Sequence, residues 1–134
     1  MSFVKFLVDT NVWLELLLAQ SRAAEAETFL SKIPVSDLAI SDFSLHSIGI
    51  ILSARNQDAA FASFLSSFVE PDGISVIKID PSRLAGVVAA MRNYKLDFDD
   101  AYQYTLAAEY DLQIISFDAH FDRAPKGRKT PGQI

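Results

Sequence analysis

The chain has 134 residues, half of them hydrophobic, including ten Phe and one Trp. This composition fits one folded domain and argues against disorder. There is no cysteine, which excludes disulfides and thiolate metal sites, so any metal must be held by carboxylates, imidazoles or water. Such ligands favour Mg²⁺ or Mn²⁺. No apolar run reaches the ~18 residues of a membrane span and no secretory signal pattern is present, so we expect a cytoplasmic protein without a membrane partner.

The net charge of −5 is unevenly distributed along the chain. Residues 1–122 carry −9, whereas the last twelve carry +4 and contain no acid. The four basic residues of this segment are Arg123, Lys126, Arg128 and Lys129. We expect one domain over residues 1–134 with a basic tail from about residue 123. The tail is either solvated or contacts phosphate or a partner beside an acidic pocket.

Three short apolar segments predict strands, and six segments with helical spacing predict helices. The strands are expected over residues 3–8, 74–79 and 112–117, and the helices over 11–19, 21–33, 42–55, 57–70, 80–93 and 97–110. Asp80 followed by Pro81 is a strong start signal for the fifth helix. Strands separated by helices indicate an α/β fold with a parallel sheet, in which sites form beyond the carboxyl ends of the strands.

Acidic residues occur at that edge of the predicted sheet. Asp9 directly follows the first strand in "FLVDTN", and Asp118 follows the third. Asp97 and Asp100, three residues apart on the predicted helix 97–110, are expected on one face, with Asp99 rotated off it. Asp100 precedes the apolar run "AYQYTLAA", which predicts a position near a buried boundary, where an acid needs a partner or a cation.

Each acid also has a purely structural interpretation. Asp9 and Asp97 could cap the helices that follow them, and Asp99 could complement a helix dipole. Asp118 could form an Asx turn. The joint occurrence of Asp9, Asp100 and Asp118 at one sheet edge favours a functional cluster. Clustered carboxylates repel one another unless a cation neutralises them, and a bound Mg²⁺ can contact phosphate and activate water. The pattern is therefore typical of a metal-dependent nuclease.

With "FLVDTNVWLEL" near the start and "DDAYQYTLAAEYDLQIISFDAHF" near the end, nearly the whole chain resembles a PIN domain, and specifically the VapC-type toxins. The resemblance implies a three-layer α/β/α fold with a central parallel sheet and an acidic Mg²⁺ or Mn²⁺ site. It also implies RNA cleavage, a homodimer, and inhibition by a small antitoxin. By position, the acids of the family correspond to Asp9, Asp100 and Asp118, Asn11 matches the Asn beside the first acid, and Ser116 is a group that supports the metal ligands.

One position departs from the family pattern. The family usually has a Glu early in its third helix, in a pattern like Ser-x-x-Thr-x-x-Glu, and in "SDFSLHSIG" that Glu is replaced by Ser47. Asp42 or His46 could substitute for it. With or without Asp97 as a further catalytic acid, the remaining three acids suffice for one Mg²⁺ completed by water, and a second metal is not expected.

Three functions follow from these observations. The first is a metal-dependent endoribonuclease, in which Asp9 and Asp100 bind the metal, Asp118 binds metal or orients water, and Asp97 supports them. The second is a weakened or inactive PIN-fold module that binds RNA or protein, because of Ser47. The third, a phosphoryl-accepting receiver-like domain, is disfavoured because Lys78 lies inside a strand. The apolar segments 13–19 and 61–68 either form a dimer surface or pack on their own sheet.

Overall fold

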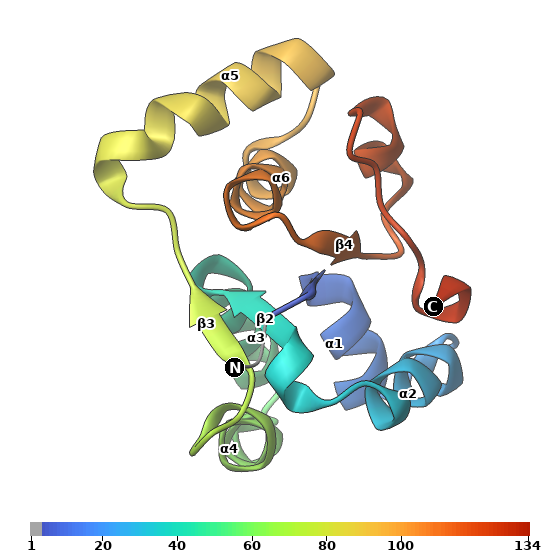
Figure 1. The fold of residues 1–134 in the computed structure, drawn as a ribbon. Helices are drawn as coiled ribbons and strands as arrows, with labels where there is room; N and C mark the ends of the chain where they lie inside the picture. The colour runs from blue at the N-terminus through green and yellow to red at the C-terminus, as the bar shows by residue number, and fades with distance from the viewer. Residues whose placement is uncertain (1–3) are drawn as a thin grey trace.

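The computed structural model describes residues 4–134 and contains a parallel sheet with the strand order β3-β2-β1-β4 (Figure 1). The strands are β1 (Phe6–Val8), β2 (Leu38–Ser41), β3 (Ser75–Ile77) and β4 (Gln113–Ile115). β1, β3 and β4 were predicted; Phe3, where the first predicted strand began, lies outside the described residues. Because β1 pairs with β4 along its length, the segments that leave their carboxyl ends lie side by side.

The sequence prediction missed β2. This strand has only four residues, follows a 3₁₀ turn at Val35–Asp37, and is buried at every position. It therefore lacks both the alternation and the length that identify a strand in a sequence. In the structure, β2 pairs with β1 on one side and with β3 on the other.

Within residues 4–134, six α-helices follow the predicted order. They are α1 (Thr10–Leu17), α2 (Ala23–Lys32), α3 (Asp42–Ala54), α4 (Asp58–Phe64), α5 (Leu84–Tyr94) and α6 (Phe98–Tyr110). The fourth is shorter than predicted, because the chain continues as a π-helical turn over Leu65–Val69. Asp80 caps a 3₁₀ turn that leads into α5, and its side chain accepts a hydrogen bond from the backbone N–H of Ser82.

Alternating strand residues build a core on each face of the sheet. Leu7 and Ile114 belong to the core formed with α5 and α6, whereas Val8 and Ile115 belong to the core formed with α1 to α4. The alternation follows from the period of two of an extended strand. Helices therefore cover both faces, and the predicted three-layer α/β/α architecture is confirmed (Figure 1).

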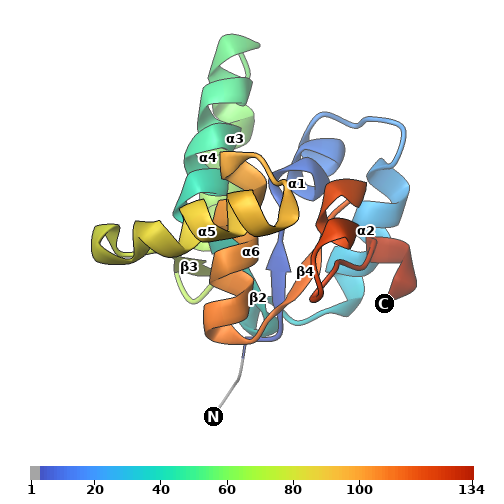
Figure 2. The same cartoon turned by 90° about the horizontal axis from the view of Figure 1, so that it is seen from above.

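The basic C-terminal segment is part of the fold. Lys129 forms a parallel bridge with Ile115, donating its backbone N–H to Ile114 O at 2.9 Å. Pro131 is buried, and the backbone N–H of Gly132 donates to Glu25 Oε2 at 2.9 Å, which fixes the C-terminus beside α2 (Figure 2). The backbone of this segment is therefore packed on the fold, while Arg123 and Lys129 are exposed, so whether its charges are solvated or contact phosphate or a partner stays a prediction. In the described part of the chain, no helix combines the length and apolar character needed to cross a membrane.

Candidate active site

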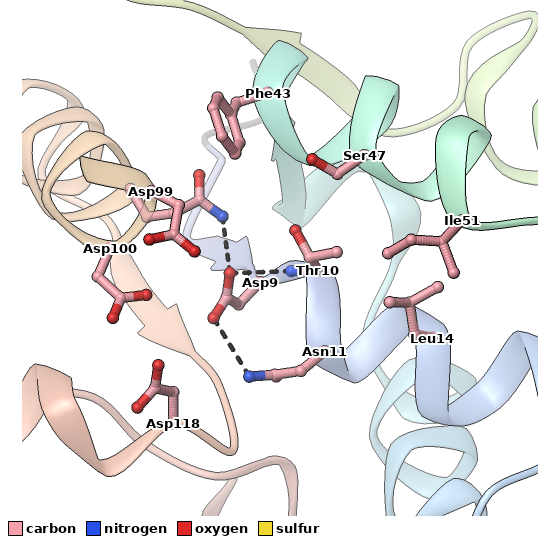
Figure 3. Close-up of a pocket in the computed structure, with 11 residues that line it drawn as sticks. Asp9, Thr10, Asn11, Leu14, Phe43, Ser47, Ile51, Asp99, Asp100 and Asp118 are labelled. Carbon is pink, nitrogen blue, oxygen red and sulfur yellow. Dashed lines mark hydrogen bonds between the residues drawn. The ribbon is translucent and has the colours of Figure 1, made fainter. Parts of the chain in front are cut away.

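A cavity of about 270 Å³ lies at the carboxyl edge of the sheet. Asp9 enters it directly after β1, and Asp118 enters it from the segment after β4. The first turn of α6 contributes Asp99 and Asp100. The structure thus brings together the three acids that were expected to meet, Asp9, Asp100 and Asp118 (Figure 3).

The Asp9 carboxylate is buried and accepts hydrogen bonds at both oxygens. Its Oδ1 accepts from the backbone N–H of Thr10 at 2.9 Å and from Gln103 Nε2 at 2.9 Å. Its Oδ2 accepts from Ser116 Oγ at 2.7 Å and from Asn11 Nδ2 at 3.4 Å. Asp9 is therefore both the N-cap of α1 and part of the cavity, so the structural interpretation and the functional one are compatible.

Asn11 and Ser116, which the family resemblance places beside the metal ligands, make further hydrogen bonds around Asp9. The Ser116 hydroxyl also accepts from Asn11 Nδ2 at 3.2 Å and from the backbone N–H of Asp118 at 2.9 Å. The Asn11 carbonyl accepts from the backbone N–H of Phe117 at 3.1 Å. These bonds tie the segment after β1 to the segment after β4, which fixes the relative positions of Asp9 and Asp118.

Asp100 and Asp118 face each other across the cavity with little hydrogen bonding (Figure 3). Asp100 is 7% exposed. His120 Nδ1 lies 3.6 Å from Asp100 Oδ2 and 3.3 Å from Asp118 Oδ1. One ligand atom from each of these residues lies within 4.8 Å of the other two, a spacing that a single cation can bridge. Asp118 also accepts from the backbone N–H of His120 at 2.9 Å, so the predicted Asx turn is present as well.

Burial and mutual repulsion oppose ionisation of these carboxylates. Burial, followed by the charges of Asp118 and Asp99, raises the pKa of Asp100 from 3.8 to about 8. Burial also raises the pKa of Asp9, against the opposing effect of the hydrogen bonds from Gln103 and Ser116. A divalent cation would favour the ionised form of both groups. The cavity donors of Asp9, Asp100 and Asp118 are carboxylate oxygens, which fit Mg²⁺ or Mn²⁺.

The helical spacing predicted that Asp97 faces the site and that Asp99 points away from it, and the structure shows the reverse. Asp97 precedes α6 with an extended backbone (φ −68°, ψ 165°), its side chain makes no capping hydrogen bond, and it is not among the cavity-lining residues of the described chain. Asp99 lines the cavity instead. The spacing argument was wrong here because it assumed that both Asp97 and Asp100 were helical.

Ser47 lines the cavity at the position where the family pattern predicts a Glu. Asp42 and His46 are not among its lining residues within positions 4–134; both line a neighbouring cavity of about 410 Å³. The Asp42 carboxylate accepts from Tyr102 Oη at 2.8 Å. Neither side chain therefore replaces the Glu at this cavity.

Sequence reasoning missed three polar residues that surround Asp9. Thr10 Oγ1 donates to Ser44 Oγ at 2.7 Å, and Gln103 Nε2 donates to the same oxygen at 2.8 Å. Both Ser44 and Gln103 are buried. The available signal was Gln103 itself, an uncharged polar residue within the apolar run of α6.

With this geometry established, comparisons with known proteins identify the family. The profile of the PIN domain matches residues 6–127. The chain belongs to the PIN domain family. The resemblance found in the sequence is therefore confirmed, and the four-stranded parallel sheet with its flanking helices is the α/β PIN fold.

Several solved structures are similar over almost the whole chain. A toxin–antitoxin complex from Klebsiella pneumoniae is 26% identical, with a TM-score of 0.75, covering 95% of this chain and 98% of the other. VapC20 of Mycobacterium tuberculosis, a toxin that cleaves the sarcin–ricin loop, is 17% identical, with a TM-score of 0.77 and coverage of 90% and 95%. FitAcB of Neisseria gonorrhoeae is 17% identical, with a TM-score of 0.74 and coverage of 96% and 99%. Curated protein sequences give no significant match.

Proposed function

We propose that this PIN domain is a Mg²⁺- or Mn²⁺-dependent endoribonuclease and the toxin of a toxin–antitoxin pair. The observation that carries the proposal is the meeting of Asp9, Asp100 and Asp118 in one cavity, where the pKa of Asp100 is raised to about 8. A site with strongly perturbed carboxylates at a sheet edge is a functional candidate. The similarity to a toxin–antitoxin complex supports the biological role.

A bound divalent cation would neutralise the carboxylates, polarise the scissile phosphate and lower the pKa of an attacking water. Asp9 and Asp100 would bind it, and Asp118 would bind it or orient the water. Hydrogen bonds from Asn11 and Ser116 would fix the position of Asp9 relative to Asp118. Asp97, outside the cavity lining, would have at most a supporting role.

The proposed partners are an RNA substrate and a small antitoxin protein. We expect the single domain to be cytoplasmic. In the basic segment, three side chains already have partners: Arg123 donates to Lys95 O, Lys126 lies 3.7 Å from Asp111, and Arg128 pairs with Asp122. Lys129 is exposed at the edge next to β4, which makes it the basic residue of this segment best placed to contact the RNA backbone.

We also propose a homodimer, on a different surface from the one that the sequence suggested. Trp13 and Phe64, from the two apolar segments, are buried in their own core, which supports the alternative that these segments pack on their own sheet. Ile50 is 70% exposed and Phe98 is 43% exposed, and both line the second cavity between α3 and α6. Ile50→Lys is expected to convert a dimer into a monomer in sedimentation experiments, with Ile50→Leu as the matched control.

The test of the nuclease assignment is cleavage of single-stranded RNA with Mn²⁺. Asp9→Asn is expected to abolish cleavage. Asp111→Asn is the matched control, because Asp111 is fully exposed and its left-handed backbone suits Asn. Full activity of Asp9→Asn would contradict the metal role of Asp9.

The alternative function is a PIN-fold module that binds RNA or protein without cleaving it. Ser47 favours this alternative, because it occupies the cavity wall where the family places a Glu. A calorimetric titration with Mn²⁺ distinguishes the two. Absence of binding by the wild-type protein at millimolar metal would support the non-catalytic module.

A further inference from the structure

Gln103 connects three elements of the cavity wall through one amide group. It lies in α6, is 2% exposed, and lines the cavity. Its Nε2 donates to Asp9 Oδ1 after β1 and to Ser44 Oγ on α3. The proposed nuclease function assigns this side chain no role.

The orientation of the Gln103 amide is determined by Asp9. An ionised carboxylate only accepts hydrogen bonds, so the NH₂ end of the amide must face it. This orientation leaves Gln103 Oε1 buried without a hydrogen-bond partner among residues 4–134. An apolar side chain at this position would leave no such group unpaired. The contact from Gln103 Nε2 to Asp9 therefore comes with an unpaired buried acceptor, Gln103 Oε1, which lowers stability.

This contact determines which Asp9 oxygen is open to a cation. Each carboxylate oxygen offers about two lone-pair sites. Oδ1 uses both, for the backbone N–H of Thr10 and for Gln103 Nε2. Oδ2 has one short bond, from Ser116 Oγ at 2.7 Å, and one long contact of 3.4 Å to Asn11 Nδ2. The oxygen that contacts Asn11 is the one turned toward Asp100 and Asp118 (Figure 3).

We propose that Gln103 is a positioning residue, which occupies Asp9 Oδ1 and presents Oδ2 as the single Asp9 ligand for a divalent cation shared with Asp100 and Asp118. The proposal rests on the metal-dependent function proposed above. The same amide fixes Ser44, which lies one helical turn before Ser47 on α3. By bonding both Asp9 and Ser44, Gln103 fixes the distance between Asp9 and the part of α3 that carries Ser47.

The test is Mn²⁺ binding by Gln103→Met, which keeps the length of the side chain but removes the donor. Tyr102→Phe is the matched control. It removes a buried hydrogen-bonding group from the same helix, where Tyr102 Oη donates to Asp42 Oδ1 and accepts from the backbone N–H of Ile79, away from the three acids. Calorimetry is expected to show at least a tenfold weaker Mn²⁺ affinity for Gln103→Met. Tyr102→Phe is expected to stay within twofold of wild type, even where both variants lower Tm equally.

RNA cleavage provides a second readout: Gln103→Met is expected to lower kcat at saturating Mn²⁺ and leave KM for RNA unchanged. Unchanged Mn²⁺ affinity in Gln103→Met, with normal binding by wild type, overturns the role of Gln103 alone. A wild-type protein that binds no Mn²⁺ overturns the proposed nuclease function and this inference with it. If Gln103→Met does not fold, a Mn²⁺-soaked crystal of the wild-type protein decides: coordination through Asp9 Oδ2 supports the inference, and coordination through Oδ1 or through both oxygens overturns it.

Discussion

The two sides of the acidic cavity hold their carboxylates in opposite ways. On the β1 side, Asp9 accepts hydrogen bonds from four groups, contributed by α1, α6 and the segment after β4. On the side of α6 and β4, Asp100 and Asp118 face each other, and the nearest side chain that can carry a positive charge is His120, at 3.6 and 3.3 Å. Asp9 is therefore fixed by hydrogen bonds, whereas Asp100 and Asp118 lie close together despite the repulsion between their charges.

This difference indicates what a metal ion would change. Asp9 has partners in the metal-free protein, so a cation would need only its Oδ2 atom. Burial raises the pKa of both acids, but only Asp9 has hydrogen bonds from Gln103 and Ser116 that lower it, whereas the charges of Asp118 and Asp99 raise the pKa of Asp100 further, to about 8. A bound cation should therefore stabilise the Asp100 side more than the Asp9 side.

The largest difference between the two sides of the cavity is expected in alanine variants of Asp9 and Asp100. Asp9→Ala and Asp100→Ala are both expected to weaken Mn²⁺ binding more than ~100-fold, because each removes a ligand. Their metal-free stabilities at pH 8 should differ in sign. Asp9→Ala leaves a helix cap and buried donors unpaired, lowering the free energy of unfolding by roughly 1–3 kcal/mol. Asp100→Ala removes a repelled charge and should raise Tm. Thermal unfolding measures both, and a lower Tm for Asp100→Ala would contradict this account.

The pH dependence of stability should show the same asymmetry. The pKa of Asp100 is about 8 in the folded protein and about 3.8 when unfolded, so between these values the folded state binds more protons. Stability must therefore fall as pH rises through this window, and Asp9, whose pKa is also raised, acts in the same direction. We expect Tm of the metal-free protein to decrease from pH 5 to pH 8. Tm of Asp100→Asn is expected to depend less on pH than Tm of the wild-type protein. An equally steep decrease of Tm in this variant would mean that another group causes the effect.

A Glu at position 47 should change metal affinity and metal-free stability in opposite directions. Ser47→Glu adds a carboxylate to the cavity wall on α3, so we expect Mn²⁺ affinity to rise about tenfold through the additional ligand, and metal-free Tm at pH 8 to fall through added repulsion. Ser47→Gln is the uncharged control. If Ser47→Glu binds Mn²⁺ no better than Ser47→Gln, this wall does not face the metal.

The smallest effect is expected from His120. Its side chain is 51% exposed, and Mg²⁺ and Mn²⁺ prefer carboxylate and water oxygens to an imidazole nitrogen. His120→Ala should therefore change Mn²⁺ affinity by less than about fivefold at pH 8, as measured by calorimetry. A loss as large as that in Asp100→Ala would instead make His120 a metal ligand.

The sequence predicted the parts of this site that depend on topology. Asp9 and Asp118 follow strands, and parallel strands end at one edge, so their meeting could be expected before the structure was known. The position of Asp100 followed from its place in a helix and from the PIN resemblance. Strand β2 could not be identified, because four buried residues after a 3₁₀ turn carry no periodicity.

Finer details depended on where α6 begins and on contacts between distant segments. The helix starts at Phe98, so the three-residue spacing that paired Asp97 with Asp100 did not apply, and Asp99 faces the cavity instead. The bonds from Gln103 to Asp9 and Ser44 connect residues 94 and 59 positions apart. No local pattern encodes such contacts, although a glutamine within an apolar helix indicates that some polar partner exists.

A calorimetric titration of the metal-free protein with Mn²⁺ at pH 8 tests whether Asp9, Asp100 and Asp118 form one cation site. The prediction is one ion bound per chain at submillimolar concentration, with binding lost in Asp100→Ala and retained in the Asp111→Asn control. Failure of the wild-type protein to bind at millimolar Mn²⁺, or equal binding by Asp100→Ala, would contradict it.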